Sequence, residues 1–111
     1  MDTQLMVQST PNPNALKFVL NVPVKSKDNI TFRKEDAKKD IPALAKAIFE
    51  LSNFIKEVYF FDNYITVTQD GTADWDELEQ KIRGAILEKI KDHNPDFTVE
   101  LEQKKDRKSV V

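Results

Sequence analysis

The sequence predicts an α+β fold, a two-layer sandwich in which two helices cover one face of a mainly antiparallel sheet. Strand-like and helix-like segments follow one another in the order strand, strand, short strand, helix, strand, strand, helix, strand. A hairpin signal in the middle of the chain favours antiparallel pairing, because parallel strands need long crossover connections. Of the 111 residues, 40% are hydrophobic, which suffices for one core, so we expect a single domain over residues 1–102.

The first two strands are expected at residues 5–7 and 15–20, which are short apolar runs. Pro11 and Pro13 lie between them and exclude a helix there, because proline lacks the backbone N–H donor. Along a strand, every second side chain points to the same face of the sheet. One face of the second strand then carries Leu16, Phe18 and Leu20.

The segment after Pro23 is expected to be mostly irregular. Residues 25–29 are all polar or charged and predict a turn, whereas residues 30–32 predict a short edge strand. Residues 33–39 are almost all charged and are interpreted as a linker.

The first helix is expected to begin after Asp40, whose carboxylate can accept hydrogen bonds from the N–H groups of the first turn. Pro42 suits that turn, because an N–H at this position would have no partner within the helix. Apolar residues at helical spacing predict a buried stripe, and the helix is expected to end near Ser52. The stripe consists of Leu44, Ala47, Ile48 and Leu51.

A hairpin is expected at residues 55–61 and 64–68, joined by Asp62 and Asn63, which tolerate the left-handed backbone angles of tight turns. Its aromatic side chains must alternate between the two faces of the sheet. One set can pack beneath the helices, and the other set must face outward. The aromatic residues concerned are Tyr59, Phe60, Phe61 and Tyr64.

The second helix is expected to open at Asp74, which together with Glu77 forms an acidic variant of the capping box. Pro95 prevents the helix from continuing. Alternating apolar residues then predict a final strand over residues 97–101. The buried stripe of the helix consists of Trp75, Leu78, Ile82, Ala85, Ile86 and Ile90.

The chain contains no cysteine, which excludes disulfides, thiolate metal ligands and thiol nucleophiles, because each of these needs a sulfur atom. The net charge of −2 provides no general attraction to nucleic acid. Residues 103–111 carry four basic residues against one acidic residue and are interpreted as a basic flexible tail. No apolar run is long enough to span a membrane and the first residues lack a signal-peptide pattern, so a cytoplasmic location is expected.

No set of residues predicts catalysis or a strong metal site, so we expect no enzymatic activity. His93 is the only histidine, whereas a zinc site needs three or four ligands; at a helix end it is interpreted as a charge favoured by the helix dipole. Asp70, Asp74 and Asp76 lack the central glycine and closing glutamate of a calcium loop, and turn and cap roles explain them. No serine lies in a glycine-flanked nucleophile elbow.

Two other binding functions stay open. A weak iron or metal site could use carboxylates together with His93, because 19 Asp and Glu residues are available. A single-stranded nucleic-acid module could use the outward hairpin aromatics and the basic tail, because aromatic rings stack on bases. The hairpin aromatics lack the basic surround typical of such platforms, which favours core packing or protein contact over nucleic acid.

Residues 10–18, with the sequence TPNPNALKF, resemble the opening signature of the N-terminal domain of Nfu (NifU-like) iron-sulfur cluster scaffold proteins. Three further segments resemble the same domain in the same order. Residues 41–51 resemble its first helix, residues 58–68 its hairpin, and the Asp-Trp pair at residues 74–75 the start of its second helix.

The resemblance covers residues 5–93 and implies an α+β fold with a role in iron-sulfur cluster assembly or delivery. In that family a separate C-terminal module bearing Cys-x-x-Cys holds the cluster, and this chain lacks that module. The resemblance therefore implies that this chain alone holds no cofactor, and that iron or a cluster would be present only with a partner. The implied partners are a cysteine-bearing scaffold module or an apoprotein that receives a cluster.

The matched loop supplies the candidate protein-binding residues. Its prolines pre-set an extended backbone and its asparagines can bond neighbouring amides, so the loop is expected to be stiff and suited to recognition. The alternative is that the loop only shapes a connection between strands. Asn53 and Phe54 stand where the family often has a glycine and a small apolar residue, so the surface there is expected to differ. The candidates are Thr10, Asn12, Pro13, Asn14 and Lys17.

Overall fold

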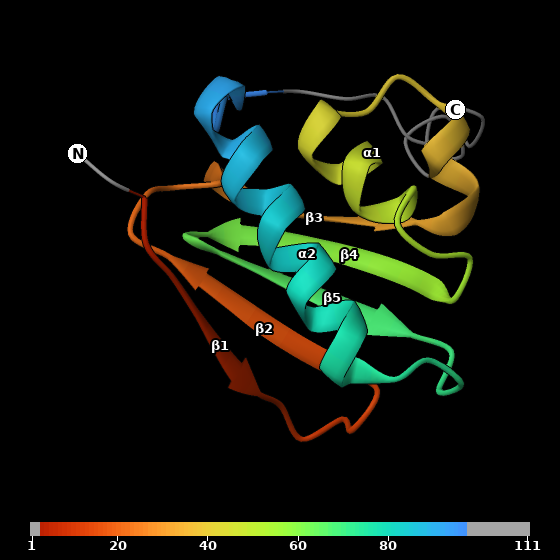
Figure 1. The fold of residues 1–111 in the computed structure, drawn as a ribbon. Coiled ribbons are helices and arrows are strands. Elements are labelled where there is room, and N and C mark those ends of the chain that lie inside the picture. Colours follow the sequence, from red (N-terminus) through yellow and green to blue (C-terminus); the bar gives the residue numbers. More distant parts are fainter. Residues whose placement is uncertain (1–2, 98–111) are drawn as a thin grey trace.

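The computed structural model describes residues 3–97 and consists of one five-stranded sheet with helices on one of its faces (Figure 1). The predicted α+β sandwich is confirmed. The strands are β1 Leu5–Ser9, β2 Ala15–Leu20, β3 Lys25–Arg33, β4 Ile55–Asp62 and β5 Tyr64–Gln69. The helices are α1 Ala43–Phe49 and α2 Trp75–Lys89, with two short 3-10 helices, η1 Lys34–Lys38 and η2 Ile90–Asp92.

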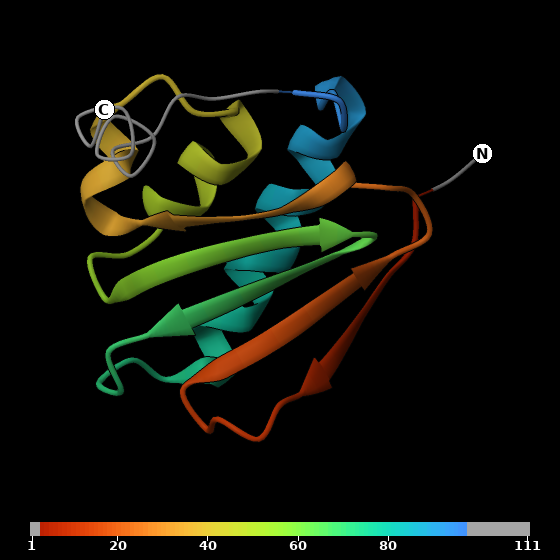
Figure 2. The same cartoon turned by 180° about the vertical axis from the view of Figure 1, so that it is seen from behind.

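All neighbouring strands are antiparallel, and their order in space is β1-β2-β5-β4-β3. The last of the described strands along the chain, β5, therefore lies in the centre, while β1 and β3 form the two edges. Figures 1 and 2 show α1 and α2 over one face of the sheet and no helix over the other face, which we call the open face. Among the described residues, no helix is long and apolar enough to cross a bilayer.

The core fills the space between the sheet and the two helices. The buried stripe of α1 differs from the prediction, because Ala45 and Phe49 are buried while Ala47 and Leu51 are only partly buried. The reason is that α1 contacts both β4 and α2, which widens its buried face beyond a single stripe. The largest fully buried side chains include Phe18, Phe32, Phe60, Leu44, Ile48, Ile65, Ile82 and Ile86.

Asp40 does not cap α1, contrary to the prediction. The helix begins later than expected, at Ala43, and Pro42 occupies the capping position without a side-chain hydrogen bond. The helix also ends at Phe49 instead of near Ser52. A carboxylate does organise the preceding segment, but it belongs to the buried Asp36, which accepts the N–H of Arg33 at 2.9 Å.

Residues 25–29 are not a free turn, because they form the first part of β3. Their polar side chains are compatible with a strand because β3 is an edge, where side chains can stay in water. The register with β4 shifts between Lys25 and Asn29, and Asp28 adopts a φ of 59° in the left-handed region. The charged linker predicted at residues 33–39 contains η1.

The predicted hairpin is confirmed as β4 and β5, with Asp62 at a φ of 52° and Asn63 between the strands. The predicted start of α2 is confirmed too, because the carboxylate of Asp74 accepts the N–H of Asp76 at 3.0 Å. Glu77 forms an ion pair with Lys81 at 3.5 Å. The basic tail at residues 103–111 and all but the first residue of the strand predicted at 97–101 lie outside the described residues.

Candidate functional site

The loop of residues 10–14, which we call the Pro-Asn loop, is held by hydrogen bonds within itself. The hydroxyl of Thr10 donates to the carbonyl of Asn12 at 2.8 Å and accepts the N–H of Asn12 at 3.1 Å. The side-chain oxygen of Asn12 accepts the N–H of Asn14 at 3.0 Å, and the carbonyl of Asn12 accepts the N–H of Ala15 at 3.0 Å. The side chain of Asn12 thus bonds a neighbouring amide, as the sequence predicted.

Contacts with distant residues fix the same loop to the rest of the fold. The indole N–H of Trp75 donates to the carbonyl of Pro13 at 3.1 Å, and the N–H of Gln69 donates to the carbonyl of Asn14 at 2.9 Å. Gly71 has a φ of 97°, and a Cβ atom there would lie 3.4 Å from the Asn14 side chain. The sequence assigned Trp75 only to the buried stripe of α2 and missed this role of its N–H.

The structure divides the five candidate residues into two places. Thr10, Asn12, Pro13 and Asn14 lie together in the Pro-Asn loop, at the end of the sheet where α2 begins. Lys17 lies away from them on the open face, where its amine is 4.1 Å from the ring centroid of Tyr64. The loop and the lysine are therefore two separate surface features, although they are close in sequence.

Three aromatic rings face outward on the open face. The ring centroids of Tyr59 and Phe61 are 6.4 Å apart, and Tyr64 lies 6.2 Å from the first and 5.7 Å from the second. Partial burial raises the pKa of Tyr64 above its ordinary value, and the neighbouring Tyr59 and Asp62 add smaller effects in the same direction. The three rings pack on one another, and the amine of Lys17 lies over the ring of Tyr64.

His93 is the C-cap residue of η2, and its side chain is partly buried. Its Nε2 atom lies 2.8 Å from the carbonyl of Val24, and its ring packs edge-on against Phe60 and beside Phe97. Burial lowers the pKa of His93 from its ordinary value, with the hydrogen bond to Val24 opposing that effect. The predicted role as a charge at the helix dipole is therefore wrong, because the site favours the neutral imidazole.

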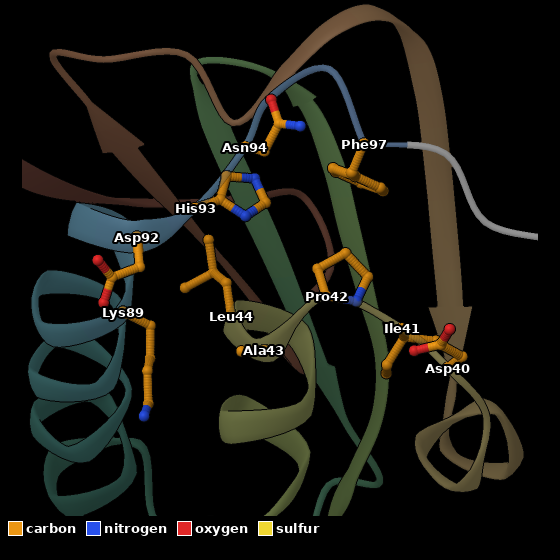
Figure 3. Close-up of a pocket in the computed structure, with 10 residues that line it drawn as sticks. All are labelled: Asp40, Ile41, Pro42, Ala43, Leu44, Lys89, Asp92, His93, Asn94 and Phe97. Atoms are coloured by element: carbon orange, nitrogen blue, oxygen red, sulfur yellow. The ribbon is translucent and has the colours of Figure 1, made fainter.

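A hollow of about 370 Å³ lies beside His93, between the start of α1 and the end of α2 (Figure 3). Asp40 and Asp92 lie on opposite sides of it, with His93 and Leu44 between them. No serine or threonine lines this hollow. Within residues 3–97, no group of three or more His, Cys, Asp or Glu side chains is placed to hold a metal ion.

Asp70 and Asp74 have the turn and cap roles that the sequence predicted. Asp70 accepts both the N–H of Thr72 at 3.0 Å and its hydroxyl at 2.6 Å, and these two bonds lower the pKa of Asp70. Phe54, in the connection between α1 and β4, is 45% exposed. Its carbonyl accepts the N–H of Asp70 at 2.9 Å, which ties the connection between α1 and β4 to this turn.

Comparison with known proteins agrees with these features. The family model described as "Scaffold protein Nfu/NifU N terminal" matches residues 5–93. NifU-like protein 4, mitochondrial, of Arabidopsis thaliana is 30% identical over 93 residues, which cover 84% of this chain and 32% of that protein. The human NFU1 iron-sulfur cluster scaffold homolog, mitochondrial, is 34% identical over 85 residues, covering 76% of this chain and 33% of that protein.

Solved structures share the fold. The NifU-like protein from Saccharomyces cerevisiae superimposes with a TM-score of 0.74 at 19% identity, covering 88% of this chain and 86% of that one. Protein SAV1430 from Staphylococcus aureus gives a TM-score of 0.65 at 21% identity, covering 77% and 98%. The chain spans about a third of the length of the curated relatives named above. On the strength of the family match, this chain belongs to the Nfu/NifU scaffold N-terminal domain family.

Proposed function

We propose that this chain is a protein-interaction domain without catalytic activity, which docks on a cysteine-bearing iron-sulfur scaffold module or on an apoprotein receiving a cluster. Family membership and the absence of cysteine from the sequence support this proposal. Thiolates are the usual ligands of iron-sulfur clusters, so the ligands of the cargo have to come from the partner. The part of this chain is then to supply a shaped surface.

The observation that carries the proposal is that the Pro-Asn loop is exposed and yet ordered. The side chains of Asn12, Pro13 and Asn14 are exposed, while hydrogen bonds to Gln69 and Trp75 hold the backbone. A loop that is ordered before it binds loses little conformational entropy on binding. Such a loop suits recognition better than a flexible connection would.

The chemistry of the described residues supports a binding role over an enzymatic one. The only imidazole is held against the carbonyl of Val24, and the hollow beside it contains no hydroxyl nucleophile. Nucleophilic catalysis needs a nucleophile within hydrogen-bond reach of a base. The cytoplasmic location expected from the sequence stays a prediction, and the Arabidopsis and human relatives are named as mitochondrial proteins.

The test is a titration of ¹⁵N-labelled chain with purified Cys-x-x-Cys scaffold modules and recipient apoproteins. We expect chemical-shift changes at the amides of residues 10–14 and Gly71 and at the indole N–H of Trp75, because these groups form or support the loop. Unchanged spectra with every candidate, at concentrations well above micromolar, would overturn the proposal.

A pair of variants separates the loop from the rest of the surface. Asn12→Ala removes the side-chain oxygen that accepts the N–H of Asn14, and it should weaken binding of a partner found in the titration. Asn29→Ala removes another exposed side-chain amide, on the β3 edge at the other side of the sheet, and should leave binding unchanged. Equal binding by both variants would exclude the Pro-Asn loop as the docking surface.

A further inference from the structure

β1 is a sheet edge without the features that usually keep an edge strand from pairing. Figures 1 and 2 show it along the outer border of the sheet, with no described element on its far side. Residues 3–9 contain no charged residue and no proline, and the register with β2 has no bulge. Charges, prolines and bulges protect free edges, because unpaired N–H and C=O groups can bind another strand.

The opposite edge, β3, has these protections. Its register with β4 is interrupted between Lys25 and Asn29, and Asp28 lies in the left-handed region. The carbonyl of Pro95 accepts the N–H of Ser26 at 2.9 Å, which occupies one of the edge donors. The charged residues of β3 are Lys25, Lys27, Asp28 and Arg33. Within residues 3–97, the contrast indicates that the β1 edge is the one available for pairing.

We propose that β1 pairs in an antiparallel register with β1 of a second copy of this chain, around a two-fold axis beside Val7. The strand has five residues with Val7 at its centre, so this pairing places Val7 opposite its equivalent and Met6 opposite Gln8 of the second copy. No like charges meet, because β1 carries none. The two five-stranded sheets then form one continuous sheet.

The open face supplies a second reason for this pairing. Met6 pairs with Val19, Val19 with Tyr64, and Tyr64 with Phe61, so these side chains form a row across four strands. The row ends at the β1 edge with Met6, which is 60% exposed. In the paired sheets the two Met6 residues are diagonal neighbours about 7–8 Å apart, within reach of long side chains. The apolar rows of the two copies then meet at this diagonal Met6 contact instead of each ending in water.

This inference goes beyond the proposed function, since it concerns the chain alone and does not use the Pro-Asn loop. Failure to dimerise would leave the partner titration unaffected, and a silent titration would leave the dimer unaffected. The two proposals are therefore tested separately.

The experiment compares the wild-type chain with two double variants by sedimentation velocity over a range of concentrations. The register places residue 6 opposite residue 8 of the second copy. Met6→Lys with Gln8→Lys, and Met6→Glu with Gln8→Glu, therefore put like charges opposite each other, and each variant alone should be monomeric. An equimolar mixture puts opposite charges together and should form dimers again. Asn29→Lys, on the β3 edge, is the control and should dimerise like the wild type.

The exposed positions of Met6 and Gln8 allow both double variants to fold, which circular dichroism checks. A wild-type chain that stays monomeric at every concentration overturns the proposal, as does a dimer that persists in both double variants. A mixture that stays monomeric also overturns it, because the register would then be wrong. If the chain is monomeric and a strand of another protein pairs with β1, the dimer proposal is wrong and that other protein is the partner of this edge.

Discussion

The hydrogen bond from Trp75 to the Pro-Asn loop can be tested by Trp75→Phe. The substitution removes the N–H that donates to the carbonyl of Pro13 at 3.1 Å and keeps a ring at the start of α2. A typical intramolecular hydrogen bond contributes about 0.5–1.5 kcal/mol net to the free energy of unfolding. The exposed carbonyl of Pro13 can bind water once the indole N–H is gone, so we expect a loss in the lower half of that range. The smaller ring also loses part of its half-buried apolar area.

We therefore expect Trp75→Phe to lower the free energy of unfolding by about 1 kcal/mol, which corresponds to a fall in Tm of about 4–8 °C for a domain of this size. Thermal and urea unfolding followed by circular dichroism measures this change. Gln80→Ala, at an exposed position of the same helix, is the control and should shift stability by less than about 0.5 kcal/mol.

Amide hydrogen exchange shows whether the effect is local to the loop. The N–H of Gln69 donates to the carbonyl of Asn14, so its exchange should speed up when the loop loses its attachment to α2. Wild-type stability together with unchanged exchange at Gln69 in Trp75→Phe would refute the reasoning that the indole holds the loop.

Three further predictions concern the supports of the fold. Gly71→Ala should destabilise the protein by about 1–2 kcal/mol, because alanine resists a φ of 97°; urea unfolding measures the loss, and wild-type stability would contradict it. Phe60→Ala should reduce stability by about 3–5 kcal/mol in the same assay, because the ring is fully buried in the core; a loss below about 1 kcal/mol would mean that the core closes over the gap. Burial lowers the pKa of His93, so its contribution to stability should be complete above the ordinary pKa of about 6.5 and should be lost as the pH falls through the lower folded value. The free energy of unfolding, measured at neutral and mildly acidic pH, tests this. His93→Gln should reduce its dependence on pH, and an unchanged dependence in this variant would mean that other groups cause it.

Local features could be read from the sequence because their hydrogen bonds join residues that are close in the chain. The hairpin turn at Asp62 and Asn63 and the cap at Asp74 are examples, and both lie where the sequence predicted them. The predicted start of α1 was wrong because an aspartate followed by a proline is compatible with several positions for the first residue of a helix. In the structure no side chain caps α1, and Asp36 accepts the N–H of Arg33 at the start of η1, before the helix.

The polar start of β3 shows why the remaining errors arose. Residues 25–29 have the composition of a turn, and only their position beside β4 makes them a strand. Propensity is a weak guide at a sheet edge, where pairing with a distant strand decides the conformation. The sequence could have indicated that Met6 faces outward, since it alternates with Leu5 and Val7, but it could not indicate that β1 is an edge.

The order of amino acids was therefore sufficient to identify the family, the class of fold, the hairpin turn and the cap of α2, because each depends on short-range chemistry or on a linear motif. The tertiary structure alone decided that the Pro-Asn loop is held by Trp75, 62 residues away, and that Lys17 lies apart from it. It also decided which edge of the sheet is free. These properties depend on which strands and helices become neighbours, and that arrangement is selected by burial of the whole core and not by any local segment.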